Sequence, residues 1–514
     1  MVASFICTDQ GRFQVILFTP GEVNATRYTT YLGPKRLTGT FAQALGAAVI
    51  VLEHRYWGLS SPFANLSSKN LEYLTLSNSI ADLTNFARHA VLPFDLQGSS
   101  HAPYAPWLLS GGSYSGSLAA WTATTSPGTF WAYTATSAPV EAISDFWEYF
   151  APVQAAMPQN CSKDVSLVID YVDNLLEHGT VTEQLDLKRM FGIGGVQHND
   201  DFMAFLENLP WMWQGNQFYV NTGFFTACDF VENANTNGSI VPGTEGVGLE
   251  KALAGYARWV NSTLLPGFCA GYGYTDDQYD TSCLDTYNAS NPIFTDWSLG
   301  NTGDRQWQWF LCNEPFGWWQ DGAPAVRPSI VSRLVTAEYW QRQCALYFPP
   351  EDEYTFGSAR GKTEAQVNAY TGGWYPGNTT RLLYINGDND PWRSGGVSSD
   401  FRPGGKLQST PEQPVLIVPG GHVSFLLTLR SCIGANSNSA TTRPTSLRKT
   451  ASSTPACVPF RTRKLPKSRL GLTSSQRLRD LPAMVVVLSV SCLGLLTISR
   501  AVGRPENPGR ALVS

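Results

Sequence analysis

The chain has 514 residues, 43% of them hydrophobic, and a formal net charge of -5. This length exceeds what one compact core usually organises, so we expect two domains, or one domain with a large insertion. The slight acidity leaves no basic surface of the kind that binds nucleic acid, and we expect no nucleic-acid partner.

Apolar runs of strand length recur along the chain, at 13–18, 47–52, 107–109, 131–136, 381–385 and 414–418. Segments with helical spacing at 37–45 and 74–91 separate the first three runs. The runs are continuous rather than alternating, which is typical of parallel strands buried on both faces. This order of strands and helices predicts an α/β fold of the α/β-hydrolase type.

The stretch 106–121, PWLLSGGSYSGSLAAW, predicts a strand, a glycine-rich turn and a helix that begins on small residues. This pattern indicates a nucleophile elbow, in which a strained turn exposes a serine at the top of the sheet. Ser113 takes the place of the nucleophile. The G-x-S-x-G motif is incomplete, because Ser115 stands where glycine is expected and Gly116 follows it. Ser115 as nucleophile, or a turn without a catalytic role, are the alternatives.

The predicted acid and base follow the last two strands. In α/β-hydrolases the triad runs in the order Ser, Asp or Glu, His, and His422 is the one histidine after residue 198. Asp388 and Asp390 compete as the acid, and Asp390 is favoured because the turn at Pro391 would orient it. Backbone N–H groups of Tyr114 and of the Gly21 region are the expected oxyanion hole.

Between residues 146 and 374 the pattern changes to helical, aromatic-rich segments, with helices expected at 165–178, 182–190 and 329–347. We therefore expect an inserted helical cap between two parts of the hydrolase domain, 1–145 and 375–430. Six of the ten cysteines lie in the cap, and an oxidising compartment would pair them in one of fifteen ways. Their spacing includes no metal-binding pattern such as C-x-x-C, so no metal and no cofactor is expected.

Four segments together resemble one serine peptidase family, which contains lysosomal prolyl carboxypeptidase, dipeptidyl peptidase II and the fungal acid prolyl endopeptidases. They are LEHRYWGLSSPF at 52–63, GGSYSGSLAAW at 111–121, NGDNDPWRSGG at 386–396 and the Gly-Gly-His turn at 420–422. The fungal branch is the most similar. The sequence departs from the family after His422, where GGHVSFL stands in place of G-x-H-C-x-D-L.

The resemblance implies a Ser113–Asp390–His422 triad that hydrolyses peptide bonds after proline in peptide or protein substrates. It also implies that Trp392, with Trp318 and Trp319 of the cap, lines a proline pocket. Glu314 is a weaker candidate for binding a substrate terminus. An esterase or lipase on the same fold, or an inactive truncated homologue, are the alternative functions.

Sequons and cysteines predict a glycosylated protein that is secreted or vacuolar/lysosomal. The N-x-S/T sequons are at Asn24, Asn65, Asn160, Asn237, Asn261, Asn288 and Asn378. Residues 1–12 lack a signal-peptide pattern, and we expect that the true N-terminus is missing. The tail 431–514 is expected to be disordered or the product of a misread frame, and membrane contact is expected only if its apolar segment 481–498 is an anchor.

Overall fold

The computed structural model describes residues 2–4, 14–92, 95, 98–216, 223–234 and 242–422. The predicted tail at 431–514, its apolar segment and the sequon at Asn237 lie outside this part of the chain. Within the described residues, no helix has both the length and the apolar character needed to cross a membrane. The same residues contain no group of three or more His, Cys, Asp or Glu side chains that could hold a metal ion.

A seven-stranded sheet forms the centre of the hydrolase part, in the order β1-β3-β2-β4-β5-β8-β9. All neighbouring strands are parallel except β1, which pairs antiparallel with β3. All six expected strands are confirmed, and β1 was not expected. The strands are β1 (Val2–Ser4), β2 (Gln14–Phe18), β3 (Ala47–Val51), β4 (Trp107–Gly112), β5 (Ala132–Thr136), β8 (Leu382–Gly387) and β9 (Val415–Val418).

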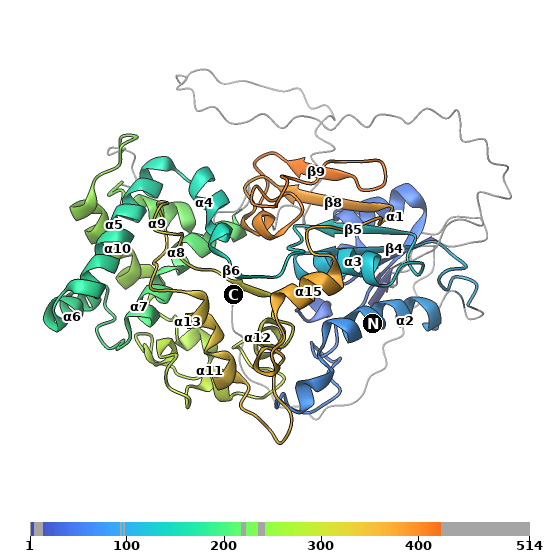
Figure 1. Cartoon of the computed structure of the whole chain (residues 1–514), viewed down its shortest axis with the longest axis horizontal. Helices are drawn as coiled ribbons and strands as arrows, with labels where there is room; N and C mark the ends of the chain where they lie inside the picture. The colour runs from blue at the N-terminus through green and yellow to red at the C-terminus, as the bar shows by residue number, and fades with distance from the viewer. Residues whose placement is uncertain are drawn as a thin grey trace, which may run out of the picture.

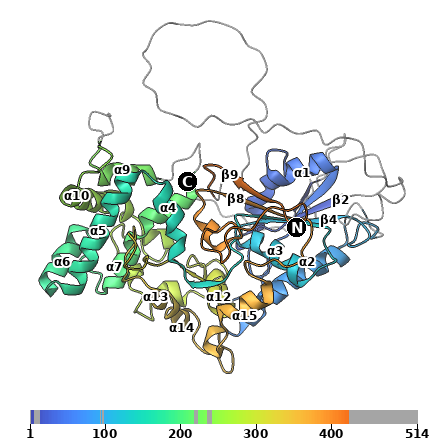
Figure 2. The same cartoon turned by 45° about the horizontal axis from the view of Figure 1, so that its top comes forward.

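Helices cover both faces of this sheet, which explains why its central strands are apolar throughout. Figures 1 and 2 show α1 (Leu37–Leu45) on one face and α2 (Leu76–His89) and α3 (Tyr114–Thr125) on the other. Helix α15 (Glu364–Thr371), within the range expected for the cap, packs against α3 beneath the sheet. Every residue of β3 is buried.

The cap lies beside the sheet and consists mainly of helices inserted between β5 and β8 (Figure 1). Its α-helices are α4 (Phe150–Ala156), α5 (Gln159–His178), α6 (Val181–Met190), α7 (Asn199–Leu206), α8 (Asn208–Trp211), α9 (Phe224–Val231), α10 (Leu249–Trp259), α11 (Pro292–Thr295), α12 (Arg305–Asn313), α13 (Ala337–Gln341) and α14 (Cys344–Tyr347). The 3-10 helix η4 (Met212–Gly215) follows α8.

The expected helix at 329–347 is wrong, because only α13 and α14 form within it. The Ser329 hydroxyl donates to the Val331 carbonyl at 2.7 Å, and the Ser332 hydroxyl bonds the Asp173 carboxylate. Such serine bonds offer the chain an alternative to helical hydrogen bonds. Helix α13 begins only after Thr336, whose side chain caps it by accepting the Tyr339 N–H.

Three disulfides join the six cap cysteines, as their position in the sequence suggested. They connect Cys161 with Cys228, Cys269 with Cys283, and Cys312 with Cys344. The first bond links α5 to α9, and the third links α12 to α14.

A second, two-stranded sheet joins the cap to the hydrolase part. Strand β6 (Ile143–Asp145), soon after β5, pairs in parallel with β7 (Gly317–Trp319), which follows α12. The close pairing depends on Gly317, because a Cβ at that position would lie 2.3 Å from the Ile143 carbonyl oxygen. This pairing carries the two tryptophans of β7 to the boundary between cap and sheet.

Candidate active site

Ser113 occupies a strained turn between β4 and α3. Its φ of 58° and ψ of -136° are rare for a residue with a side chain, and its N–H donates to the Thr136 carbonyl at 2.9 Å. Gly111 makes room for the turn, since a Cβ there would lie 2.0 Å from the Ser115 carbonyl oxygen. This geometry is that of the nucleophile elbow that the sequence predicts.

Ser115, in the first turn of α3, is hydrogen-bonded to Gly112 at the end of β4. Its buried hydroxyl donates to the Gly112 carbonyl at 2.7 Å, and the Gly112 N–H returns a bond of 3.2 Å. The second small residue that the elbow requires is Gly116, where a Cβ would lie 2.9 Å from the Thr136 carbonyl oxygen. The bonds of Ser115 to Gly112 favour Ser113 as the nucleophile.

Ser113 opens onto a cavity of about 500 Å³, which we call the Ser113 cleft. The hydrolase part and the cap both contribute to its walls. Residues lining it are Phe18, Pro20, Glu22, Val23, Tyr28, Gly112, Ser113, Tyr114, Ser115, Pro139, Gln214, Gly215, Asp304, Trp307, Trp318 and Trp392. The volume lies within the usual range for small-ligand sites.

The loop after β2 lies directly against the residue that follows Ser113. A Cβ on Gly21, whose φ is +77°, would lie 3.4 Å from Cδ1 of Tyr114 and 3.2 Å from Cβ of Ser115. The structure thus brings together the two segments expected to supply oxyanion-hole N–H groups. The Tyr114 side chain points away into the core, where its hydroxyl is 3.2 Å from Nε2 of His54.

Three indoles wall the cleft. The rings of Trp318 and Trp392 meet edge to face at 5.9 Å, and Trp307 stacks on Trp318 at 6.0 Å. Hydrogen bonds fix two of them, because Trp318 Nε1 donates to the Glu141 carbonyl and Trp392 Nε1 donates to Oε1 of Gln214. Trp307 is a cleft residue not predicted from the sequence, although it begins the aromatic-rich stretch WQWFLCNEPFGWW at 307–319.

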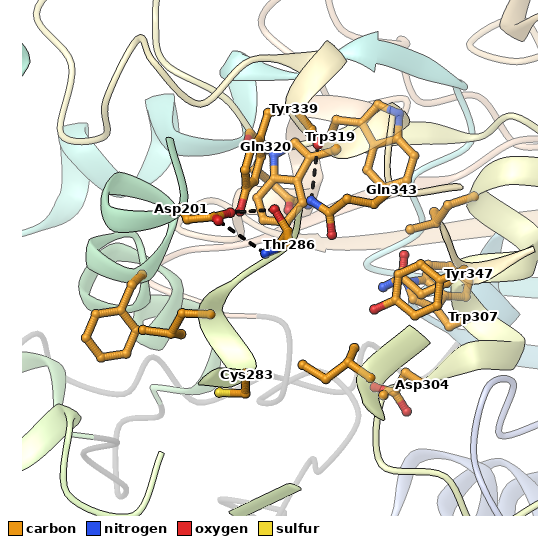
Figure 3. A pocket seen from close by; sticks show the side chains of 18 of the residues that line it. Asp201, Cys283, Thr286, Asp304, Trp307, Trp319, Gln320, Tyr339, Gln343 and Tyr347 are labelled. Atoms are coloured by element: carbon orange, nitrogen blue, oxygen red, sulfur yellow. Dashed lines mark hydrogen bonds between the residues drawn. The ribbon is translucent and has the colours of Figure 1, made fainter. Parts of the chain in front are cut away.

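A second cavity of about 400 Å³ lies within the cap, and we call it the cap cavity. Figure 3 shows Asp304 and Trp307 on one side of it and Asp201 with Thr286 on another. Trp319 lines this cavity and is absent from the lining of the Ser113 cleft. The two cavities adjoin, since both are lined by Asp304, Trp307, Trp318 and Trp392.

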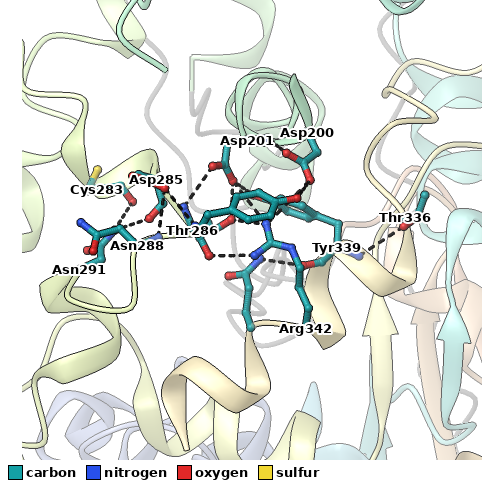
Figure 4. Close-up of polar contacts among 12 residues, drawn as sticks. Asp200, Asp201, Cys283, Asp285, Thr286, Asn288, Asn291, Thr336, Tyr339 and Arg342 are labelled. Carbon is teal, nitrogen blue, oxygen red and sulfur yellow. Dashed lines mark hydrogen bonds and ion pairs between the residues drawn. The ribbon is translucent and has the colours of Figure 1, made fainter. Parts of the chain in front are cut away.

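The wall of the cap cavity is braced by a polar cluster drawn in Figure 4. Asp201 accepts hydrogen bonds from the hydroxyls of Thr286 and Tyr339, and the Arg342 guanidinium donates to the Thr286 carbonyl at 2.8 Å. These bonds tie α7 to α13 and to the loop that precedes α11. Because its partners are protein groups, we assign this cluster a structural role.

Glu314 is not among the described residues that line the Ser113 cleft or the cap cavity. Its buried carboxylate pairs with the Lys362 ammonium and accepts a bond from the Asn313 side chain at 3.2 Å. The structure therefore gives Glu314 a partner within the protein instead of a place for a substrate terminus.

Asp390 follows β8 and begins the 3-10 helix η9 (Pro391–Gly395). Its carboxylate Oδ1 accepts the Trp392 N–H at 2.9 Å, as the turn at Pro391 suggested. The Oδ2 atom is buried without a hydrogen-bond partner. Burial raises the pKa of Asp390 to about 7, because the charged form is poorly solvated there.

His422 follows β9 and is also buried. Its ring packs on the indole of Trp213 at 4.7 Å, and its Nδ1 has no hydrogen-bond partner. Burial lowers the pKa of His422, while the Trp213 backbone and the charge of Asp388 act in the opposite direction. The imidazole is therefore biased towards the neutral form that a general base requires.

The loops carrying Asp390 and His422 touch each other. The Asn389 N–H donates to the Gly421 carbonyl at 3.1 Å, and the Gly420 N–H donates to Oδ1 of Asp388. Asp388 thus holds the histidine loop. Among the described residues, no hydrogen bond joins His422 to Asp390 or to Ser113.

Comparison with known proteins decides the family. A profile described as serine carboxypeptidase S28 matches residues 7–403. The chain belongs to this family. Ser113 and Asp390 lie within the matched residues, and His422 lies beyond them.

Several relatives of this S28 peptidase are similar over most of the chain. Serine protease vicPa of Bipolaris victoriae is 42% identical over 413 residues, which cover 79% of this chain and 76% of vicPa. A probable extracellular serine carboxypeptidase of Arthroderma benhamiae is 28% identical over 427 residues, which cover 79% of this chain and 56% of the Arthroderma protein. The mouse thymus-specific serine protease is 28% identical over 403 residues, which cover 75% of this chain and 70% of the mouse protein.

Among solved structures, a proline iminopeptidase of Mycobacterium smegmatis aligns with 83% of this chain and 87% of its own. The TM-score is 0.31 at 11% identity, a likeness too loose to carry an argument. Family membership and the parallel sheet with its serine elbow together make this S28 protein a serine peptidase with the α/β-hydrolase fold.

Proposed function

We propose that this S28 peptidase hydrolyses peptide bonds on the carboxyl side of proline through a Ser113–His422–Asp390 triad. The observation that carries the proposal is the cleft beside Ser113, which Trp307, Trp318 and Trp392 wall with flat indole rings. Proline within a peptide has no N–H to recognise, so apolar ring surfaces are its natural binding wall.

In the proposed reaction, His422 accepts the proton of Ser113 while Oγ attacks the carbonyl carbon that follows proline. The Tyr114 N–H and an N–H of the Gly21 loop stabilise the oxyanion, each such donor contributing about 3 kcal/mol in comparable enzymes. The imidazolium then protonates the leaving amine. Water then attacks the acyl-enzyme while His422 accepts its proton. The imidazolium returns this proton to Oγ of Ser113 as the peptide product with its new carboxyl group leaves.

Two unpaired buried atoms support the assignment of acid and base. The triad requires a bond from Nδ1–H of His422 to Oδ2 of Asp390, and both atoms are among the buried side-chain atoms that lack hydrogen-bond partners. Catalytic hydrogen bonds are commonly open in free enzymes and close when substrate binds. In the proposed enzyme, this closure brings the imidazole of His422 into hydrogen-bond contact with Asp390 and Ser113.

Turnover of acetyl-Ala-Pro-anilide and acetyl-Ala-Gly-anilide tests the specificity. We expect kcat/KM to be at least about 100-fold higher for the proline substrate, and Trp392→Ala to remove most of that ratio. The matched control Trp131→Ala replaces a tryptophan outside the cleft. Equal turnover of both anilides, or turnover of short esters alone, would contradict the proposal and favour an esterase.

The same protein is proposed to be a secreted or vacuolar glycoprotein that acts on proline-containing peptides or proteins. Exposed sequons at Asn65, Asn288 and Asn378 support this, together with the three cap disulfides. The Asn24 and Asn160 sequons are half-buried. The Asn261 amide donates to two backbone carbonyls of the protein, which disfavours a glycan there.

A further inference from the structure

The Ser113 cleft carries two carboxylates that the proposed reaction does not use. Glu22 lies on the loop after β2, and Asp304 precedes α12 of the cap, so the two approach the cleft from opposite parts of the molecule. Burial raises the pKa of Glu22 to about 7, and the negative charge of Asp304 adds to this shift. Both carboxyl groups line the same cleft, and a negative charge on one disfavours ionisation of the other.

One carboxyl oxygen of Glu22 lacks a hydrogen-bond donor. Its side chain as a whole is half-buried, but its Oε2 atom is buried and has no hydrogen-bond partner. A buried carboxyl oxygen without a hydrogen-bond partner is costly, and a donor that reaches it lowers this cost. The oxygen belongs to a residue of the cleft wall, so a ligand in the cleft can reach this side chain.

Asp304 stands where the Ser113 cleft meets the cap cavity, and its side chain is exposed to that space. Its carboxylate makes no ion pair with any described residue and does not cap the helix that it precedes. Figure 3 shows it beside Trp307 on the wall of the cap cavity.

No lysine, arginine or histidine is present among the described residues that line the two cavities. Their charged lining residues are Glu22, Asp304 and Asp201, and Asp201 is already satisfied by Thr286 and Tyr339. Glu22 and Asp304 are therefore two carboxyl groups beside Ser113 without an ion-pair partner among the described residues that line the cavities.

We infer that Glu22 and Asp304 form a subsite for an ammonium group of the substrate, the free N-terminal amine on the acyl side of the cleaved bond. An ammonium offers three donors, so it can satisfy both carboxylates at once. The inference rests on the proposed function, because it assumes that peptides are cleaved at Ser113.

This subsite predicts the mode of cleavage. A substrate that places its C-terminal carboxylate beside Glu22 and Asp304 would be repelled, since the lining offers that carboxylate no cation. A short peptide with a free amino end would be attracted. Removal of short N-terminal peptides is therefore expected to be faster than removal of a C-terminal residue.

Binding to a Ser113→Ala chain tests the subsite without requiring turnover. We expect H-Ala-Pro-Ala-amide to bind about tenfold more tightly than its N-acetyl twin by calorimetry. In chains that also carry Glu22→Gln and Asp304→Asn, the ratio should fall to about one. Asp186→Asn, which alters an exposed carboxylate outside both cavities, should preserve it.

A third peptide, acetyl-Lys-Pro-Ala-amide, separates the two sources of an ammonium group. Weak binding of this peptide supports recognition of the N-terminal amine, whereas binding as tight as that of the free-amine peptide would overturn it in favour of a lysine side chain. An acetylated peptide that binds as well as the free-amine peptide would overturn the inference altogether. Fluorophosphonate labelling of the Ser113-containing chain shows separately whether the proposed function holds, so the two failures are distinguishable.

Discussion

At the scale of single residues, the chemistry depends on how Asp390 and His422 are held. Both follow strands of the central sheet, and contacts between their loops bring them near each other. The sequence could predict these positions, because carboxyl ends of parallel strands share one edge of a sheet. It could not predict that the imidazole packs on Trp213, since that indole comes from a distant part of the chain.

Asp390→Asn should lower kcat about 10⁴-fold while leaving the fold intact. The amide oxygen can still accept the Trp392 N–H, so the turn at Pro391 is preserved. The amide nitrogen, however, cannot hold the imidazole in the required tautomer. Steady-state kinetics and thermal melting of the variant provide the two measurements.

The matched control is Asp388→Asn, which changes the competing acid. Its carboxylate holds the histidine loop through the Gly420 N–H, and an amide oxygen can keep that bond. We expect kcat to fall less than about tenfold. A larger loss for Asp388→Asn than for Asp390→Asn would reverse the assignment of the acid.

At the scale of elements, the elbow between β4 and α3 was predicted well because its requirements are local. Small residues at fixed offsets from Ser113 are visible in the sequence, and Gly111 and Gly116 prove to be the positions without room for a side chain. The walls of the cleft were predicted less completely. Asp304 and Trp307 reach it only through the placement of α12, which depends on the packing of the whole cap.

Gly111→Ala should destabilise the protein by about 3 kcal/mol and abolish activity, because its methyl group would collide with the Ser115 backbone. Ser115→Gly removes a hydroxyl that bonds Gly112 and should cost about 1 kcal/mol. Denaturant unfolding measures both values. A Ser115→Gly chain with no reaction towards fluorophosphonate would show that Ser113 alone does not suffice as nucleophile.

At the scale of the whole molecule, buried carboxyl groups set the dependence of stability on pH. Burial raises the pKa of Asp321 to about 9, with Asp145 and Glu148 adding to the shift, and raises that of Glu148 to about 7. The pKa of Glu207 is also raised well above its usual value by burial. Asp145 is the last residue of β6, and Asp321 follows β7 closely, so both belong to the region that joins cap and sheet.

The melting temperature should be higher at pH 5 than at pH 8, by on the order of 5 °C. A carboxyl group with a raised pKa binds a proton in the folded chain that the unfolded chain has released, so stability falls as pH rises from about 4 to 7 and beyond. Burial lowers the pKa of His54 to about 4, so the unfolded chain binds a proton there that the folded chain does not. This histidine therefore makes stability fall as pH drops below about 6.5. The maximum is therefore expected near pH 5.

Asp321→Asn should flatten this dependence, since the amide cannot ionise. Asp186→Asn, at an exposed ion pair with Arg189, should leave it unchanged. Differential scanning calorimetry across pH 4 to 8 measures both slopes. Stability that rises steadily from pH 5 to pH 8 would contradict the role given to the buried carboxyl groups.

Glycosylation is expected at the exposed sequons Asn65, Asn288 and Asn378 and not at Asn261, whose amide is used within the fold. Peptide mapping of protein from a eukaryotic secretion host, before and after deglycosylation, locates the glycans. A fully occupied Asn261 would require the π-helical turn at 260–264 to open.

The most direct test of the proposed catalytic serine is reaction of the full chain with a fluorophosphonate, followed by intact-mass analysis and peptide mapping. We predict one adduct, on Ser113, lost in Ser113→Ala, strongly slowed in His422→Ala and retained in Ser115→Ala. Undiminished labelling of Ser113→Ala, or an adduct on Ser115, would contradict the account.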